Sequence, residues 1–78
     1  MDKETQKYYE RYFDLFSNEG WSQLIEEMED TFATINNVTT IQDEKDMYYR
    51  KGQLDAMLNI IRFKNTIEET YEDLVAND

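Results

Sequence analysis

The sequence predicts an all-α protein of three helices, two short and one long, folded as a helical hairpin or small bundle. The 78-residue chain contains no proline and only two glycines, so few residues interrupt a helix. Apolar residues recur at helical spacing in every segment. Although the formal net charge is −10, 40% of the residues are hydrophobic and 14% are aromatic, which favours collapse over disorder. We therefore expect one small helical domain over residues 1–78.

The first expected helix covers residues 3–16, and its apolar stripe is almost entirely aromatic. The stripe consists of Tyr8, Tyr9, Tyr12, Phe13 and Phe16. The stretch FSNEGW then predicts a corner. With Ser17 as the N-cap of the next helix, Phe16 and Trp21 occupy the positions of a hydrophobic staple. Alternatively, Gly20 ends the first helix in a left-handed cap.

The second expected helix covers residues 18–35 and is the most clearly amphipathic. Its apolar stripe consists of Trp21, Leu24, Ile25, Met28, Phe32 and Ile35. Its other face carries Glu26, Glu27, Glu29 and Asp30, with no basic residue among them. The stretch NNVTTIQ predicts a loop, in which Thr39 or Thr40 is placed to cap the third helix.

The third expected helix covers residues 41–74 and has two apolar faces. One face consists of Met47, Leu54, Leu58 and Ile61. The other consists of Tyr49, Ala56, Ile60, Phe63, Ile67, Tyr71 and Leu74. A helix that is apolar on two sides is buried on two sides. Because two short helices cover only one of them, the second face predicts another copy of the chain or a different protein partner. A break at Lys64–Asn65 is left open.

The amino-acid usage bears on stability and on chemistry. A chain this short buries only about 60% of its unfolded surface, so a monomer is marginal. Without cysteine there is no disulfide to add stability, and oligomerisation remains. The absence of both histidine and cysteine removes the usual general base and thiolate chemistry. We therefore expect no enzyme, no cofactor and no metal site.

A basic, tyrosine-led segment stands out in this acidic chain. Residues 45–64 hold five of the eight basic residues, namely Lys45, Arg50, Lys51, Arg62 and Lys64. Asp46–Arg50 and Lys51–Asp55 are spaced for ion pairs along a helix. Gly52 is expected to allow close approach of the first helix, since glycine in a helix interior usually has a packing reason. The expected interaction surface comprises Trp21, Tyr48, Tyr49, Arg50, Lys51, Gly52, Leu54, Leu58, Ile61 and Arg62.

Other partners and chemistries are weighed against this interpretation. Glu68, Glu69 and Glu72 share a helix face that could hold magnesium, a pattern similar to that of all-helical nucleotide pyrophosphatases, although in reversed order along the chain. In a chain with 18 acidic residues, a solvated face is the simpler interpretation. The net charge argues against direct nucleic-acid binding. No stretch approaches the about 18 apolar residues of a membrane span.

Two stretches, YYERYFDLFSNEGW and YYRKGQLDAMLNIIRFK, carry a resemblance that covers residues 8–72. The chain resembles a group of small acidic helical proteins encoded by tailed bacteriophages, which run from an aromatic helix through a Gly-Trp corner to a Tyr-Arg-Lys-Gly-Gln-Leu helix. The resemblance implies a virion-associated or assembly protein in the virion or host cytoplasm, with no catalytic residue. The alternatives are an acidic host-directed inhibitor that mimics DNA and a magnesium-dependent nucleotide hydrolase.

Overall fold

A computed structural model describes residues 1–78 and contains helices but no strand. Four α-helices follow one another, α1 (Lys3–Phe16), α2 (Glu19–Ile35), α3 (Glu44–Ile61) and α4 (Phe63–Ala76), with a short 3₁₀ turn, η1 (Val38–Thr40), before α3. The all-α prediction is confirmed. The expected long helix over residues 41–74 is divided in two, so the chain has four α-helices instead of three.

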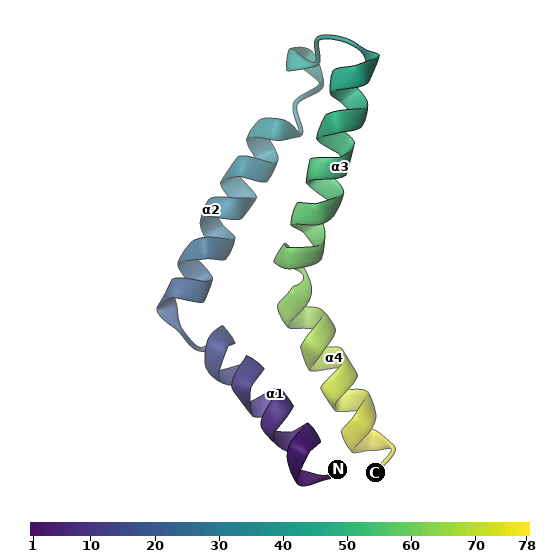
Figure 1. Ribbon diagram of the computed structural model, residues 1–78. Helices are drawn as coiled ribbons and strands as arrows, with labels where there is room; N and C mark the ends of the chain where they lie inside the picture. The colour runs from purple at the N-terminus through teal and green to yellow at the C-terminus, as the bar shows by residue number, and fades with distance from the viewer.

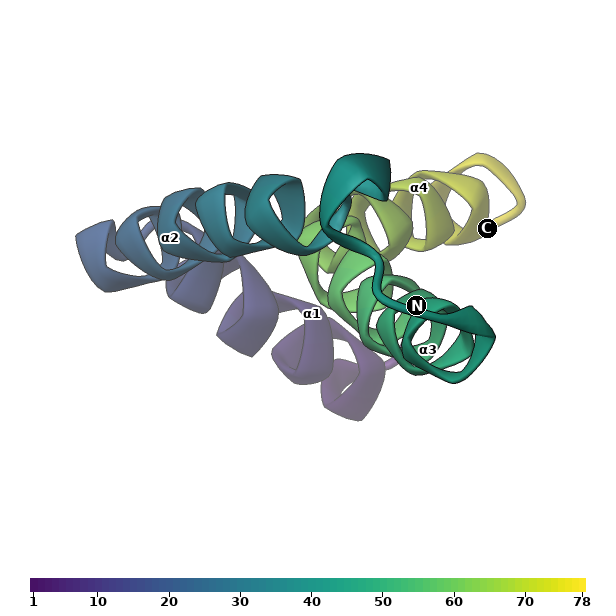
Figure 2. The ribbon, with the colours of Figure 1, turned by 90° about the horizontal axis from the view of Figure 1, so that it is seen from above.

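The helices form an elongated hairpin measuring 51 × 26 × 17 Å (Figure 1). One leg consists of α1 and α2, the other of α3 and α4, and η1 lies at the tip. In this arrangement α2 packs along α3, and α1 packs along α4. Seen from above, α1 swings away from the line of α2 and α4 from the line of α3, so both legs are bent (Figure 2).

Three side chains cap the helices at their N-terminal ends. Asp2 accepts a hydrogen bond from the Thr5 amide at 2.7 Å, Asn18 from Gly20 at 2.7 Å, and Asp43 from Asp46 at 2.7 Å. The expected caps at Ser17, Thr39 and Thr40 are therefore wrong. Ser17 instead ends α1, and its hydroxyl donates to the Phe13 carbonyl at 2.9 Å. Gly20 has no positive φ and lies inside the first turn of α2.

The break between α3 and α4 falls at Arg62, three residues before Asn65. No glycine or proline marks this position in the sequence. The Phe63 ring packs against Tyr12 and Phe16, with ring centroids 5.1 and 6.1 Å apart, at the end of α1. The other leg turns at residues 17–18, at a similar height in the hairpin (Figure 1). We attribute the break to this packing, because α4 must change direction to follow α1.

The buried core lies almost entirely between α1 and α4. Its three buried residues are Tyr9, Phe16 and Ile67. Partly buried rings and chains surround them, contributed by Tyr12, Phe13, Trp21, Phe63 and Tyr71. By contrast, α2 and α3 contain no buried residue. The expected contact between Phe16 and Trp21 is present, with ring centroids 5.3 Å apart, although the Trp21 ring is only half-buried.

Candidate protein-interaction surface

The structure divides the expected interaction residues between two faces of α3. Those that face α2 are half-buried, namely Arg50, Leu54, Leu58 and Ile61. The others are exposed, namely Tyr48, Tyr49, Lys51 and Gly52, together with Arg62 at the C-terminal end of α3. Tyr49 and Lys51 also line the hollows between Arg50 and the end of α2. Trp21 lies apart from both groups, at the corner between α1 and α2. The expected residues therefore do not form one surface, and only the exposed group is open to a partner.

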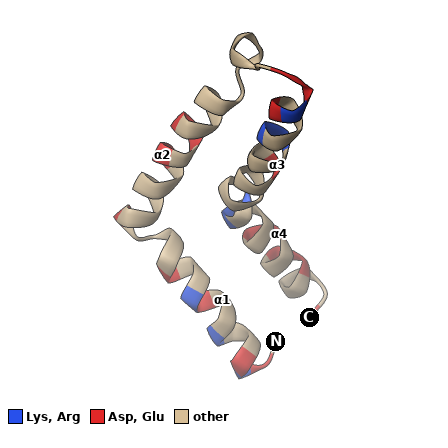
Figure 3. Cartoon of the chain, turned by 45° about the horizontal axis from the view of Figure 1, so that its top comes forward, with Lys and Arg blue, Asp and Glu red and all other residues tan.

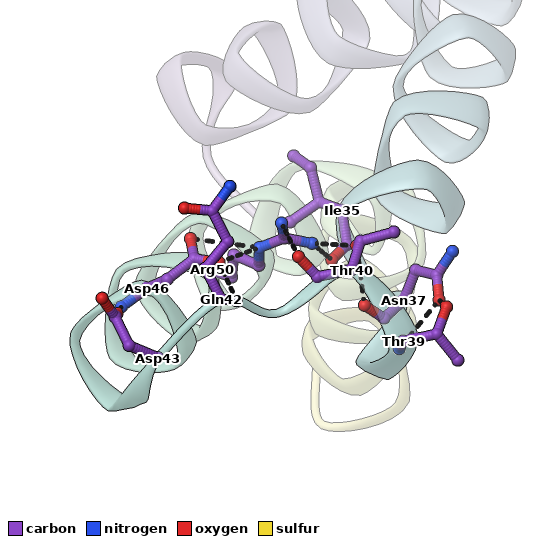
Figure 4. A network of polar contacts seen from close by, with 8 residues as sticks. All are labelled: Ile35, Asn37, Thr39, Thr40, Gln42, Asp43, Asp46 and Arg50. Carbon is purple, nitrogen blue, oxygen red and sulfur yellow. Dashed lines mark hydrogen bonds and ion pairs between the residues drawn. The ribbon is translucent and has the colours of Figure 1, made fainter.

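Arg50 connects α3 to the end of α2 and to the loop between them (Figure 4). Its Nη1 donates to the Ile35 carbonyl at 3.2 Å and to Thr40 Oγ1 at 2.7 Å, and its Nη2 donates to the Thr40 carbonyl at 3.1 Å. Its Nε also pairs with the Asp46 carboxylate at 3.1 Å, which confirms the expected Asp46–Arg50 pair. Ile35 ends α2, and its carbonyl accepts a hydrogen bond from the Asn37 amide at 2.9 Å in addition to that from Arg50. Arg50 is therefore a clamp that holds the tip of the hairpin.

The other side of this clamp is the Asp46 carboxylate. It accepts a hydrogen bond from the Gln42 amide at 3.1 Å in addition to those from Arg50. The hydrogen bond from Gln42, followed by those from Arg50, lowers the pKa of Asp46 below its ordinary value of 3.8. On the far side of the loop, Asn37 Oδ1 accepts from the Thr39 amide and hydroxyl at 3.1 and 2.6 Å. The tip is thus fixed by polar contacts on both sides.

The exposed side of α3 carries apolar side chains that touch no other ring. We call Tyr48, Tyr49, Gly52, Ala56 and Ile60 the outer face of α3. Tyr48 and Tyr49 are 64% and 68% exposed, and neither belongs to any of the aromatic contacts, which all involve α1, α4 or Trp21. Ile60 is 43% exposed. A rigid helix therefore presents two aromatic rings and an aliphatic chain to solvent.

Gly52 lies at the centre of the outer face and does not contact α1. A Cβ added at Gly52 would meet no atom within 4 Å. The expected close approach of the first helix is wrong, because α2 runs beside α3, along the opposite side of the helix, and α1 packs on α2 and α4. Packing within the chain thus gives no reason for a glycine in the middle of α3.

The basic residues around α3 differ in whether the chain neutralises them. Lys51 pairs with Asp55 at 3.1 Å, as the spacing predicted, and Lys64 lies 4.0 Å from Glu68. Lys45 and Arg62 make no ion pair. Arg50 contacts the Ile35 and Thr40 oxygens and Asp46, and it makes no ion pair with the carboxylates of α2.

Charge is distributed unevenly among the helices (Figure 3). α3 contains three basic and three acidic residues, so its net charge is zero. α2 contains five acidic and no basic residues, and α4 contains four acidic residues and one lysine. The acidic excess therefore lies on α2 and α4, whereas α1 and α3 are each neutral, and no carboxylate of α2 makes an ion pair.

The carboxylates of the acidic helices are not grouped into a metal site. No group of three or more carboxylates is placed to hold a metal ion. Two hollows lie at the tip and are both lined by Arg50, with volumes of about 580 and 160 Å³. Because the chain's own oxygens accept hydrogen bonds from all three guanidinium nitrogens, the clamp is poorly suited to bind an anion. No helix has the length and apolar character needed to cross a membrane.

No protein-family model, curated protein or solved structure matches this chain. The functional argument therefore depends on the exposed surfaces. Sequence reasoning found most of the outer face but missed the contacts of Arg50 with Ile35 and Thr40. The only sequence signal for that clamp was the i, i+4 spacing of Asp46 and Arg50, which does not reveal a partner across a loop.

Proposed function

We propose that this chain is a small non-enzymatic protein that docks on other protein surfaces, as a structural or assembly component of a bacteriophage. The observation that carries the proposal is the outer face of α3, where Tyr48 and Tyr49 are exposed on a helix held by the Arg50 clamp. Tyrosine is enriched where proteins bind one another. The phage assignment depends on the resemblance of residues 8–72 described above.

Docking would proceed by helix packing and charge complementarity. Tyrosine side chains have few rotamers, so fixing them in an interface costs little conformational entropy. The clamp adds to this by holding α3 in place before a partner arrives, which favours affinity through preorganisation. The acidic faces of α2 and α4 would orient the partner and keep the chain in solution.

Incomplete burial supports a role in an assembly. Only three of the 78 residues are buried, and all of them lie in α1 and α4. A small domain with so little core is marginally stable alone, and association with a partner stabilises it by mass action. The partner would be another virion protein or a further copy of this chain, in the virion or the host cytoplasm.

Mass spectrometry of particles from a phage that encodes this chain tests the proposal. Peptides of the chain are expected in purified virions or in their assembly intermediates. The variant Tyr48→Ala/Tyr49→Ala should be incorporated less, because it removes both exposed rings of the outer face. Tyr8→Ala is a matched control, because Tyr8 is 47% exposed but lies on α1. Absence of the chain from virions and intermediates alike would contradict the proposal.

A second candidate function is supported by α2. Its exposed carboxylates, Glu26, Glu27, Glu29 and Asp30, have no basic partner in the chain. A row of this kind could imitate DNA phosphates and inhibit a host nuclease or polymerase. Competition between the chain and duplex DNA for such an enzyme would support this function. Replacing the four carboxylates with amides should then abolish competition, whereas the outer-face variants should leave it intact.

A further inference from the structure

We infer that the outer face of α3 binds the same face of a second copy, with the two helices antiparallel and centred on Gly52. This inference builds on the proposed docking function and names its partner. It is carried by the exposed apolar side chains of the face and by the positions of charges at its two ends. The occupant is a copy of this chain.

The outer face continues a stripe that the chain itself covers elsewhere. Tyr49, Ala56 and Ile60 are exposed on α3. Beyond Arg62 the same apolar pattern continues on α4 as Phe63, Ile67 and Tyr71, which pack against α1. A helix therefore covers the second half of the stripe and none covers the first half. The uncovered half runs over residues 49–60, about 16 Å at 1.5 Å per residue, so a second helix has room to pack along it.

Gly52 allows that occupant to approach closely. Glycine destabilises a helix interior, and here no atom of the chain would contact a Cβ at this position. Ala56 lies one turn from Gly52, so the side chains at the centre of the face are small, whereas those of Tyr48 and Tyr49 beside them are large. Small residues between larger ones permit two helix backbones to pack near one another.

Electrostatics favours a second copy at this face over the acidic faces of α2 and α4. Two chains that each carry −10 repel one another, and the repulsion is strongest where acidic faces meet. α3 has no net charge, whereas α2 and α4 are both acidic. A contact through α3 therefore keeps the acidic faces of α2 and α4 away from the shared interface.

The antiparallel orientation follows from Lys45 and Arg62, two cations at opposite ends of α3 that make no ion pair within the chain. When Gly52 of one copy faces Gly52 of the other in an antiparallel pair, a residue lies level with the residue of the other copy whose number brings the sum to 104. Lys45 then lies one turn from Asp55 of the other copy, and Arg62 lies beside Asp43 and Glu44. A parallel pair would instead place each cation beside its own equivalent, which is repulsive.

A charge exchange tests the orientation. Glu44 and Arg62 lie at opposite ends of α3, about 27 Å apart at 1.5 Å per residue, so they do not interact within one chain. Arg62→Glu should weaken self-association at low salt by about tenfold or more, as should Glu44→Arg, because each leaves like charges opposed across the pair. The double variant should restore association toward the wild-type level. Sedimentation equilibrium measures each dissociation constant, and circular dichroism confirms that helicity is unchanged.

A steric pair of variants tests the face itself. Ala56 and Ala33 are both exposed alanines in helix interiors, on α3 and α2 respectively. Ala56→Arg should make the chain monomeric, because the new side chain fills the low centre of the face. Ala33→Arg changes the net charge equally and should leave association unaltered. Equal association of both variants would overturn the inference, as would failure of the charge exchange to restore binding.

The results separate this inference from the proposed function. A wild-type chain that stays monomeric at micromolar concentration and above overturns the second-copy inference. If that monomer still enters phage particles and needs Tyr48 and Tyr49 to do so, the docking function stands with a different partner. A chain that dimerises as described but is absent from particles and assembly intermediates supports the inference and contradicts the phage role.

Discussion

The half of the hairpin built by α1 and α4 buries its apolar stripe, whereas the half built by α2 and α3 leaves its stripe half-exposed. Tyr9, Phe16 and Ile67 are buried in the first half, within a cluster of edge-to-face and tilted rings. The second half contains mainly aliphatic side chains, and none is buried. The difference shows that large aromatic rings fill the space between two helices where aliphatic side chains leave it open.

The two halves are therefore held by different forces. Packing of rings stabilises the α1–α4 half, and each ring removes a large apolar area from water. The α2–α3 half relies on the polar clamp at its tip, where Arg50 joins Ile35, Thr40 and Asp46. We expect substitutions in the first half to unfold the chain and substitutions in the second half to loosen it locally.

The largest effect is expected at Phe16. Phe16→Ala should lower the free energy of unfolding by about 3–5 kcal/mol, because the ring is buried and contacts Tyr12, Trp21 and Phe63. The matched change in the other half, Phe32→Ala, should cost about 1–2 kcal/mol, since that ring is only half-buried. Urea denaturation measures both values. Equal losses would mean that the two halves share one core.

The next effect is expected at the clamp. Arg50→Lys should destabilise the chain by about 1–3 kcal/mol, because one ammonium group cannot reach Ile35, Thr40 and Asp46 together. Hydrogen exchange should accelerate in residues 36–43 and change little in α1 and α4. Lys51→Ala is the control, since its ion pair with Asp55 is exposed and should contribute less than about 1 kcal/mol. Acceleration spread evenly over all four helices would contradict a local clamp.

Asp46 should make the α2–α3 half sensitive to acid. Its pKa is lowered in the folded chain, so its contribution to stability is present above 3.8 and is lost as the pH falls through and below that value. The difference in stability between wild type and Asp46→Asn should therefore be largest near neutral pH and should close in acid. In an Arg50→Ala background the difference should shrink but persist, because the Gln42 amide still donates to the carboxylate. A difference independent of pH would show that the Asp46 charge is unimportant.

Periodicity was sufficient to predict the helices, because each helix carries a stripe that its neighbour covers at least in part. The break at Arg62 was not predictable, since it depends on Phe63 packing against the end of α1 and not on a local breaker. The N-cap at Asn18 was displaced by one residue from the prediction. Both Ser17 and Asn18 are good caps, and the sequence does not reveal that Ser17 bonds backward to Phe13.

The part of the candidate site that consists of exposed apolar side chains could be predicted from the sequence. The two apolar faces of residues 41–74 indicated that one would lack cover, and the Tyr49–Ile60 part of the second face is exposed. The role of Arg50 was not predictable, because its partners belong to a loop whose path is fixed only in three dimensions. Trp21 illustrates the same limit, since its contact with Phe16 followed from spacing but its half-burial did not.

The smallest change in stability is expected at the two glycines. Gly52 lies in the interior of a helix and Gly20 lies next to a helix cap, so the same substitution should have different effects at the two positions. Gly52→Ala should stabilise the isolated chain by about 0.5–1 kcal/mol, because it reduces backbone freedom and no atom within 4 Å opposes the new methyl group. Gly20→Ala should gain less or lose stability, since its Cβ would lie 2.9 Å from Asn18 Oδ1, the atom that caps α2. Thermal unfolding at low protein concentration measures both changes without a contribution from association.

If Gly52→Ala destabilised the isolated chain, the outer face would be covered within the monomer. If it stabilised the monomer and weakened self-association, the glycine would be explained by contact with a second copy.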